Sequence, residues 1–402
     1  MELVKYLLIA CLGSTVIGQL IRLEFFPTAA LTLTDVIVLA TDVVFVILAL
    51  TLKKSLNLKT KLFVPAIVFT LFALATNVLA ILNLPQAQVF ASSLFLFRFL
   101  SLVFIAFVVS ATVSRQKITN WVNLMLTFGL VFAVVGILQL IFFPDLSAYT
   151  VYGWDPHQKR VFSTFLDPNF TGFANVIFFN VAIACFLFAK RPYKKLDYYY
   201  LIVAIFSFIS LILTFSRSSY LAFMAAIAVI GLVKSPKLFL IAAFAFLSLF
   251  LLVPQMQARI VGAFRFDDTS QARVESWQNG LAVFEKNPVF GTGFNTFRYV
   301  QARDNLFTNE SPLGGHSGSG VDSSLLLVAA TTGIVGEIIF LTLFLFVFLS
   351  VKKKATKNPI KLAACATIVS IFVHSQFVNS LFFPQIMLLF WFLIGLTLAN
   401  DS

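Results

Sequence analysis

The sequence predicts an all-α integral membrane protein of about twelve transmembrane helices, with a large and partly helical outer loop. Of its 402 residues, 59% are hydrophobic and only 11% are charged, and the mean hydropathy is +0.95. A helix needs about 20 apolar residues to cross the hydrocarbon core of a bilayer, and apolar runs of roughly this length recur along the whole chain. This composition excludes a soluble globular protein.

We expect a single polytopic membrane domain that covers residues 1–402. Its spans are the apolar runs between charged or Pro-containing breaks. They lie near 3–21, 29–52, 62–82, 89–113, 121–143, 169–189, 198–215, 219–233, 238–254, 323–350, 362–380 and 385–399.

The positions of the basic residues predict the orientation. With the N-terminus inside, the cytoplasmic connections hold Lys5, Lys53, Lys54, Lys59, Lys61, Arg115, Lys117, Lys190, Arg191, Lys194, Lys195, Lys234, Lys237, Lys352, Lys353, Lys354, Lys357 and Lys361. The short opposite connections hold only Arg22, Lys159, Arg160 and Arg217. Lys and Arg gather on the cytoplasmic side of membrane proteins, so we expect both termini in the cytoplasm. The formal charge of +12 is then mostly a topology signal and not a sign of nucleic-acid binding.

Two outer connections, 144–168 and 255–322, are too long to be plain turns, and long loops in compact proteins are usually functional. In the second loop, Val274, Trp277, Leu281 and Phe284 recur at helical spacing from about 271 to 284. This pattern predicts an amphipathic helix over the outer mouth of the bundle. The Gly291-Thr292-Gly293 sequence follows no predicted strand, so we interpret it as a turn and not as a dinucleotide fingerprint.

Arg217, in TFSRSSY, lies at the turn between two apolar runs, where a charged side chain is costly. A guanidinium at headgroup depth suits a phosphate, which it can bind with two parallel hydrogen bonds. The alternative is an arginine that only reaches toward lipid phosphates. Both interpretations stay open on the residues alone.

Arg273 and Arg160 are two further candidates for anion binding. Arg273 would lie near the start of the loop helix, where the helix dipole also favours an anion, or it is simply a solvated charge. Arg160 begins RVFSTFLDPNF at the entrance of the sixth span. In the same motif, Asp167 precedes Pro168, so its expected role is an N-cap.

Two residues near the exit of the long loop are candidate general bases. They are His316, in a Gly- and Ser-rich tract, and Asp322, just before the tenth span. Asp322 has an alternative role as a helix cap. His157 and His374 are isolated in the sequence, and no metal site is expected from any of the three histidines.

Within the predicted bundle, Asp35 and Asp42 share a face of the second span and Arg98 lies in the fourth. The depths of Asp35 and Arg98 below the outer ends of their helices are similar enough for an ion pair. A proton relay is the alternative, but no continuing chain of buried acids is visible. We therefore predict a structural pair.

Four motifs together resemble the O-antigen ligase and polymerase family. They are RVFSTFLDPNF, TFSRSSY, ARVESWQNGLAVFEKNPVFGTGF and VDSSLLLVAATTGIVG, in the order seen in that family and spread over the chain from about residue 120 onward. The resemblance implies a multi-span protein of the bacterial cytoplasmic membrane. Such proteins move a glycan from an undecaprenyl-diphosphate carrier to an acceptor on the outer face.

The resemblance also implies roles for particular residues. Arg217 and Arg273 match arginines thought to hold the donor diphosphate, and Arg160 matches a further basic position. Family ligases commonly have a His-Asn pair directly before the span that here begins VDSSLLL, whereas this chain has Asp322-Ser323, with His316 upstream. The departure leans toward a polymerase-like or unclassified member with Asp322 as the base. The implied partners are the lipid-linked donor, a glycan, lipid or protein acceptor and the membrane lipids, with no nucleotide sugar, metal or other cofactor and no nucleic acid.

Three other functions compete with this interpretation. A transporter or flippase would use Arg98, Asp35 and Asp42 along a central path. A many-span peptidoglycan glycosyltransferase would also use a polyprenyl-diphosphate donor. A passive structural role leaves the 255–322 loop, with its six basic residues, without a purpose.

Overall fold

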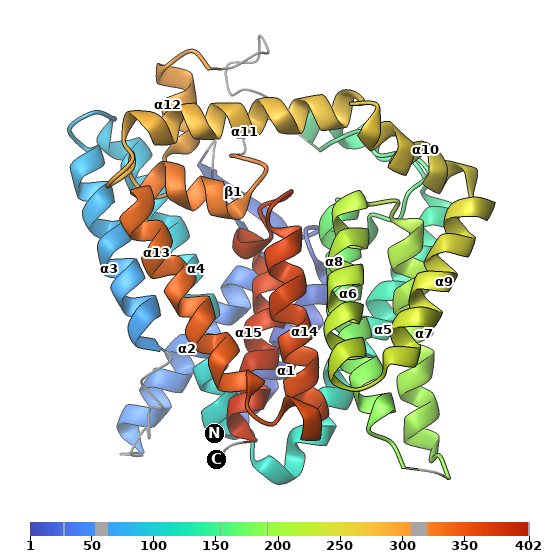
Figure 1. Ribbon diagram of the computed structural model, residues 1–402. Helices are drawn as coiled ribbons and strands as arrows, with labels where there is room; N and C mark the ends of the chain where they lie inside the picture. The colour runs from blue at the N-terminus through green and yellow to red at the C-terminus, as the bar shows by residue number, and fades with distance from the viewer. Residues whose placement is uncertain (27–28, 53–62, 153, 191, 307–319, 401–402) are drawn as a thin grey trace.

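Helices dominate the fold in the computed structural model, which describes residues 1–402 except 27–28, 53–62, 153, 191, 307–319 and 401–402 (Figure 1). The helices are α1 (Glu2–Ile17), α2 (Leu33–Thr51), α3 (Phe63–Ala80), α4 (Gln86–Thr112), α5 (Ile118–Phe142), α6 (Pro168–Leu187), α7 (Lys195–Leu213), α8 (Arg217–Val233), α9 (Pro236–Leu252), α10 (Pro254–Phe264), α11 (Asp268–Lys286), α12 (Phe297–Arg303), α13 (Ser324–Lys352), α14 (Pro359–His374) and α15 (Pro384–Ala399).

The predicted class, an all-α membrane protein, is confirmed. A helix occupies each of the twelve predicted ranges. Within the described residues, seven helices are each long and apolar enough to cross a membrane, and α9 with the segment after it forms a further candidate that bends by 95°. Helices α8, α14 and α15 are apolar but shorter. The number of crossings therefore stays a prediction.

The start of the predicted second span is wrong. Residues 29–32 are not helical but form strand β2 (Ala29–Thr32), which pairs antiparallel with β1 (Arg22–Phe26). Helix α2 begins only at Leu33, where Thr32 and Asp35 form a capping box. This reciprocal cap satisfies orphan backbone donors at the helix start, so the apolar run divides into a strand and a helix at Thr32.

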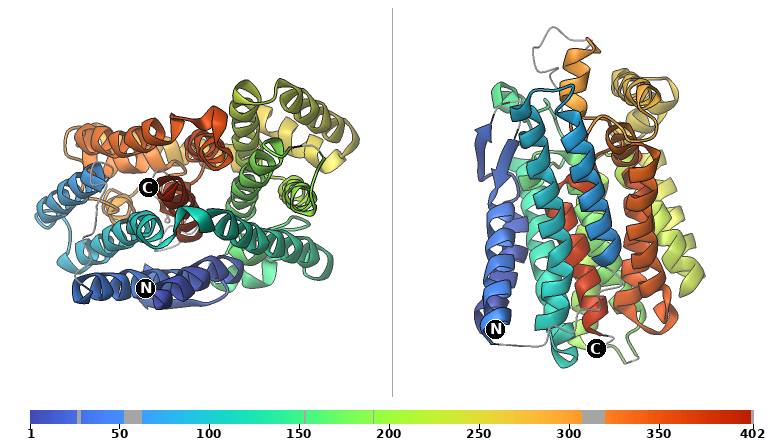
Figure 2. Two further views of the ribbon diagram at one scale, coloured as in Figure 1. Left: turned by 90° about the horizontal axis from the view of Figure 1, so that it is seen from below. Right: turned by 90° about the vertical axis from the view of Figure 1, so that its left-hand side faces the viewer.

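Helix α15 runs through the centre of the bundle, and the other helices surround it (Figure 2). All its residues from Pro384 to Ala399 are buried. A helix that is apolar on every side is typical of such a fully enclosed position. Its sequence thus suits the core of the bundle and not a surface that faces lipid.

Helices α10 and α11 lie across one end of the bundle, which we call the α11 end (Figure 1). The helix predicted near 271–284 is α11, but its packed face is shifted. Ser276, Gly280 and Val283 are buried, whereas Leu281 is 48% exposed. A Cβ on Gly280 would lie 2.9 Å from Leu326 of α13, so the small residues let α11 approach α13 closely.

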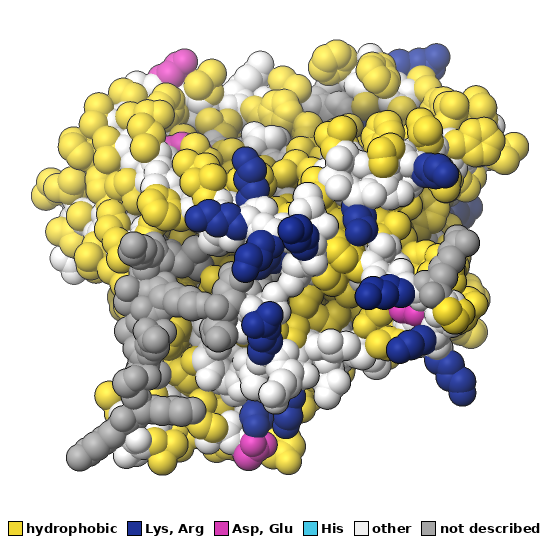
Figure 3. Space-filling model, turned by 60° about the horizontal axis from the view of Figure 1, so that its bottom comes forward, with side chains coloured by type: hydrophobic (Ala, Val, Ile, Leu, Met, Phe, Trp, Pro, Cys, Tyr) yellow, Lys and Arg dark blue, Asp and Glu magenta, His cyan; other side chains and the backbone are white. Residues whose placement is uncertain are grey.

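The opposite end carries both termini (Figure 1), and Lys and Arg side chains gather over it (Figure 3). This asymmetry fits the prediction that the termini face the cytoplasm. The orientation itself stays a prediction.

Helix α13 breaks at Gly333, where the backbone has φ = 66°. The Gly-rich turn after α11 contacts both sides of this break. The amide of Ile334 donates to the carbonyl of Pro288 at 2.8 Å, and the amide of Gly293 donates to Thr331 at 2.9 Å. The turn predicted at Gly291–Gly293 therefore joins the 255–322 loop to the tenth predicted span.

We expect Gly333→Ala to destabilise the protein by about 1–3 kcal/mol for the strained backbone alone. The added Cβ would also lie 2.1 Å from the carbonyl oxygen of Val289. The thermal unfolding midpoint of the detergent-purified protein measures the loss. Gly13→Ala is the control, because its Cβ would meet nothing closer than Phe128 at 3.6 Å. An equal midpoint for the two variants would contradict the role of the break.

The predicted ion pair between Arg98 and Asp35 is present. Arg98 Nε lies 2.9 Å from Asp35 Oδ1, and Arg98 Nη2 donates to Asp35 Oδ2 at 3.0 Å. The side chains are 16% and 6% exposed. Arg98 also donates to the carbonyl of Ala30, so the pair holds β2 and α2 against α4. Asp42 bonds Ser101.

We expect Arg98→Leu to reduce the amount of folded protein far more than the activity of each folded molecule, because removal of one partner of a buried pair costs about 3–5 kcal/mol. Arg98→Leu combined with Asp35→Asn should recover much of this loss, since the amide oxygen preserves the cap at Thr32. Size-exclusion yield and specific activity are the two readouts. A folded Arg98→Leu protein with no activity would favour the transporter interpretation.

Candidate functional site

A cavity of about 700 Å³ lies beneath α11 and is large enough for a small ligand. We call it the arginine cavity, because Arg160, Arg217, Arg259 and Arg273 all line it. Three of these were candidates from the sequence, and Asp322 lines the same cavity. The structure therefore brings together the predicted Arg160, Arg217, Arg273 and Asp322.

Arg217 is the first residue of α8, after a turn in which Phe215 has φ = 49°. Its guanidinium binds the Asp267 carboxylate in a fork, with Nη1 at 3.0 Å from Oδ2 and Nη2 at 3.2 Å from Oδ1. Asp267 is also the N-cap of α11. Burial alone would raise the pKa of Asp267, but its hydrogen bonds with Ser270 and the charge of Arg217 lower it below the usual value. The pair thus attaches the start of α11 to α8.

Arg259 and Arg273 have unused hydrogen-bonding capacity. The Nε atom of each is buried and has no hydrogen-bond partner among the described residues. Burial is the largest cause that lowers the pKa of both side chains, and the charge of Arg217 lowers both further. Buried donors without a partner are costly, and guanidinium groups this close together repel one another. An anion in the cavity would relieve both effects.

Arg160 serves mainly as a structural support. Its Nε donates to the carbonyl of Thr214 at 2.8 Å and its Nη2 to that of Phe215 at 3.3 Å. These carbonyls belong to the turn that carries Arg217. Burial, followed by the charge of Arg259, lowers the pKa of Arg160 to about 9. Arg160 therefore positions the Arg217 turn, in addition to lining the cavity.

Asp322 is not the cap of α13. Ser323 is the N-cap and accepts from the amide of Leu326 at 3.2 Å. The backbone of Asp322 is fixed by α11, because its amide donates to Ser276 Oγ at 2.9 Å and its carbonyl accepts from Trp277 Nε1 at 3.0 Å. The Asp322 charge also raises the pKa of Arg273, against the larger effect of burial. Asp322 therefore lines the same cavity as the arginines, on a backbone that α11 holds in place.

Asp167 has the role expected from the sequence, that of the N-cap of α6. Its Oδ1 accepts from the amides of Asn169 at 2.6 Å and Phe170 at 3.1 Å. His316, the other predicted base, lies outside the described residues. His157 lines the arginine cavity. In the described part of the chain, no three His, Cys, Asp or Glu side chains come together as a metal site would require.

Sequence reasoning missed Arg259, Asp267 and the surroundings of His374. His374 was treated as an isolated residue, yet its Nε2 lies 3.3 Å from Ser218 Oγ, and Ser218 lines the arginine cavity. Its Nδ1 contacts Ser380 Oγ at 2.5 Å. The position of His374 within a predicted span gave no sign of this contact. The only hint in the sequence was the serine-rich motif TFSRSSY.

Comparison with known protein families gives a match to a family model. Residues 202–341 match the O-antigen ligase family model. This segment includes the motifs TFSRSSY, ARVESWQNGLAVFEKNPVFGTGF and VDSSLLLVAATTGIVG, whereas RVFSTFLDPNF lies before it. No curated protein matches the chain. Over residues 202–341 the chain is thus similar to the O-antigen ligases. This match confirms the resemblance for the three motifs within the segment and supports a membrane enzyme that ligates or polymerises glycans.

Proposed function

We propose that this protein transfers a glycan from an undecaprenyl-diphosphate carrier to an acceptor hydroxyl on the outer face of the bacterial cytoplasmic membrane. The observation that carries the proposal is the arginine cavity with its two buried, unpartnered Nε donors on Arg259 and Arg273. A diphosphate presents several charged oxygens, which is the group that clustered guanidinium groups bind best.

The proposed chemistry is displacement of the diphosphate from the anomeric carbon of the donor. Negative charge grows on the leaving oxygens as the glycosidic bond breaks, and Arg217, Arg259 and Arg273 stabilise it. Asp322 takes the proton of the acceptor hydroxyl as the new bond forms. Such a reaction requires no metal, since the arginines supply the positive charge. Attack from the face opposite the leaving group gives inversion at the anomeric carbon.

The termini are then cytoplasmic and α11 is outside, as the basic residues predict. The loops 144–168 and 255–322 form the outer site, because they supply Arg160, Arg259, Arg273 and Asp322 to one cavity. Helix α11 covers this cavity, which limits the access of bulk water to the reacting groups.

The test uses the purified protein in lipid vesicles, with an undecaprenyl-diphosphate oligosaccharide and candidate glycan, lipid and protein acceptors. Gel electrophoresis and mass spectrometry identify the products. A ladder of products defines a polymerase, and a single transfer to an added acceptor defines a ligase. A donor that crosses the bilayer but stays chemically intact with every acceptor would replace the proposal with a transporter.

A further inference from the structure

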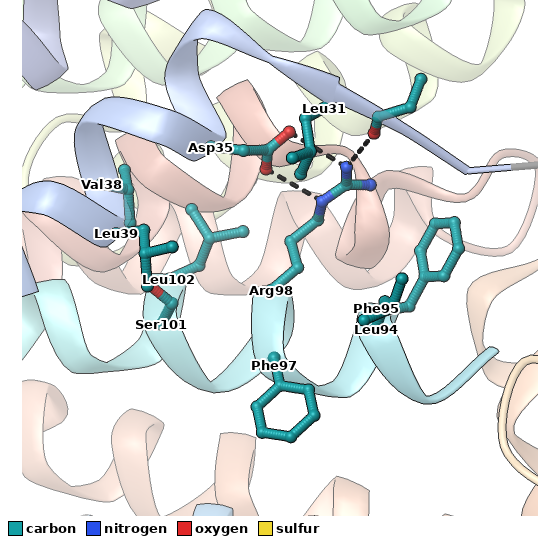
Figure 4. A pocket seen from close by; sticks show the side chains of 11 residues that line it. Leu31, Asp35, Val38, Leu39, Leu94, Phe95, Phe97, Arg98, Ser101 and Leu102 are labelled. Atoms are coloured by element: carbon teal, nitrogen blue, oxygen red, sulfur yellow. Dashed lines mark hydrogen bonds and ion pairs between the residues drawn. The ribbon is translucent and has the colours of Figure 1, made fainter. Parts of the chain in front are cut away.

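A second cavity, of about 380 Å³, lies between α2 and α4 near the β1–β2 hairpin (Figure 4). We call it the lateral groove. Its walls are mainly apolar, and Leu39 and Phe97 are 58% and 66% exposed, so the groove opens on the side of the bundle. Its polar end is closed by the Arg98–Asp35 ion pair.

The lateral groove and the arginine cavity share a wall. Phe95 lines both of them. A small void of about 10 Å³ lies beside this wall, with Phe95 and Arg98 on one side and Phe382, which also lines the arginine cavity, on the other. Arg98 lies 5.0 Å from the centre of the Phe95 ring, which fixes the ring beside the guanidinium.

A lipid-linked substrate in the arginine cavity needs a way out of the bundle for its hydrocarbon chain. Helix α11 covers the cavity above, and α15 fills the centre below. The chain must therefore leave through the side of the bundle. A third cavity, beneath α11, is also apolar, but none of its lining residues lines the arginine cavity.

We propose that the lateral groove binds the polyprenyl chain of the donor whose diphosphate lies in the arginine cavity. This inference rests on the proposed function. The chain passes Phe95 and Phe382 and then lies against the apolar sides of α2 and α4. Arg98 remains in its ion pair and does not contact the diphosphate.

The benefit of such a site is orientation. A hydrocarbon chain gains no hydrophobic free energy when it moves from lipid to an apolar groove, because the two surroundings are equally apolar. A groove with a fixed exit instead limits the directions from which the diphosphate enters the arginine cavity. Alignment of the reacting atoms then costs less entropy in the transfer step.

The experiment compares two donors that carry the same oligosaccharide diphosphate, one on an undecaprenyl chain and one on a chain of two isoprene units. Leu39→Trp and Leu94→Trp fill the groove from α2 and α4. We expect each to lower kcat/KM of the long-chain donor by at least about tenfold and to leave kcat/KM of the short-chain donor unchanged. Ile47→Trp is the matched control, since Ile47 is exposed on α2 but does not line the groove.

Photocrosslinking of undecaprenyl diphosphate with a diazirine in its first isoprene units reports binding without the reaction. We expect labelled peptides from α4, and loss of the label in Leu39→Trp. Equal effects of Leu39→Trp on both donors, an altered KM for the acceptor alone, or no change would overturn the groove assignment and leave the transfer activity in place. A wild-type protein that uses neither donor would overturn the proposed function, and the groove assignment with it.

Discussion

Arg217→Ala lowers kcat/KM for glycan transfer by about 10²–10³-fold, the usual loss when one donor to a developing negative charge is removed. Arg217 lines the arginine cavity from the first turn of α8, next to the unpartnered Nε donors of Arg259 and Arg273. The loss should appear with the purified protein in vesicles, measured at saturating acceptor. Arg217→Lys keeps the charge but not the planar fork, so we expect it to recover only part of the activity.

Asp267→Ala separates this role from a structural one. Asp267 binds Arg217 with two hydrogen-bonded oxygens and caps α11, so its removal releases α11 from α8 but leaves the guanidinium in the cavity. We expect Asp267→Ala to reduce stability, by about 1 kcal/mol for the cap, and to reduce transfer much less than Arg217→Ala. Equal losses of transfer would mean that Arg217 only fastens α11.

Asp322→Asn lowers kcat by about 10²–10⁴-fold, the contribution of a positioned general base, while donor binding changes little. The substitution keeps the backbone contacts with Ser276 and Trp277, so the start of α13 stays in place. Single-turnover kinetics with a radiolabelled donor measure the chemical step, and filter binding measures donor affinity. Asp322→Glu should retain part of the rate, because it keeps a carboxylate.

Asp268→Asn is the matched control for Asp322. Asp268 also lines the arginine cavity, but it is exposed in the first turn of α11, where an acidic residue favours the helix dipole. We expect its kcat to stay close to that of the wild type. A large loss in Asp268→Asn together with normal turnover in Asp322→Asn would move the base to α11.

Much of the fold was predictable, because hydrophobicity marks each long apolar helix directly. The exceptions are places where particular hydrogen bonds override an apolar run. Thr32 and Asp35 start α2 directly after strand β2, and Gly333 breaks α13 where the turn at Gly291–Gly293 docks. Gly333 and the turn at Gly291–Gly293 are far apart in the sequence, so composition and periodicity do not indicate their contact.

The candidate site was predictable in its residue types and only partly in its geometry. Arg217, Arg273 and Asp322 stand out because charges are rare in this chain and costly near lipid. Arg259 and Asp267 were missed, because the place of Arg259 in the cavity and the contact of Asp267 with Arg217 depend on the 95° bend between α9 and the segment after it, which brings the loop back over the bundle. Arg160 was assigned an anion-binding role, whereas its hydrogen bonds also hold the turn of Arg217.

The central claim is that the arginine cavity binds a diphosphate. Isothermal titration of the detergent-purified protein with a water-soluble short-chain prenyl diphosphate tests it most directly. We expect one site per chain, weaker binding at higher salt, and at least about 100-fold lower affinity in Arg217→Ala combined with Arg273→Ala. If the double variant bound the diphosphate with the same affinity and the same salt dependence as the wild type, the account would be contradicted.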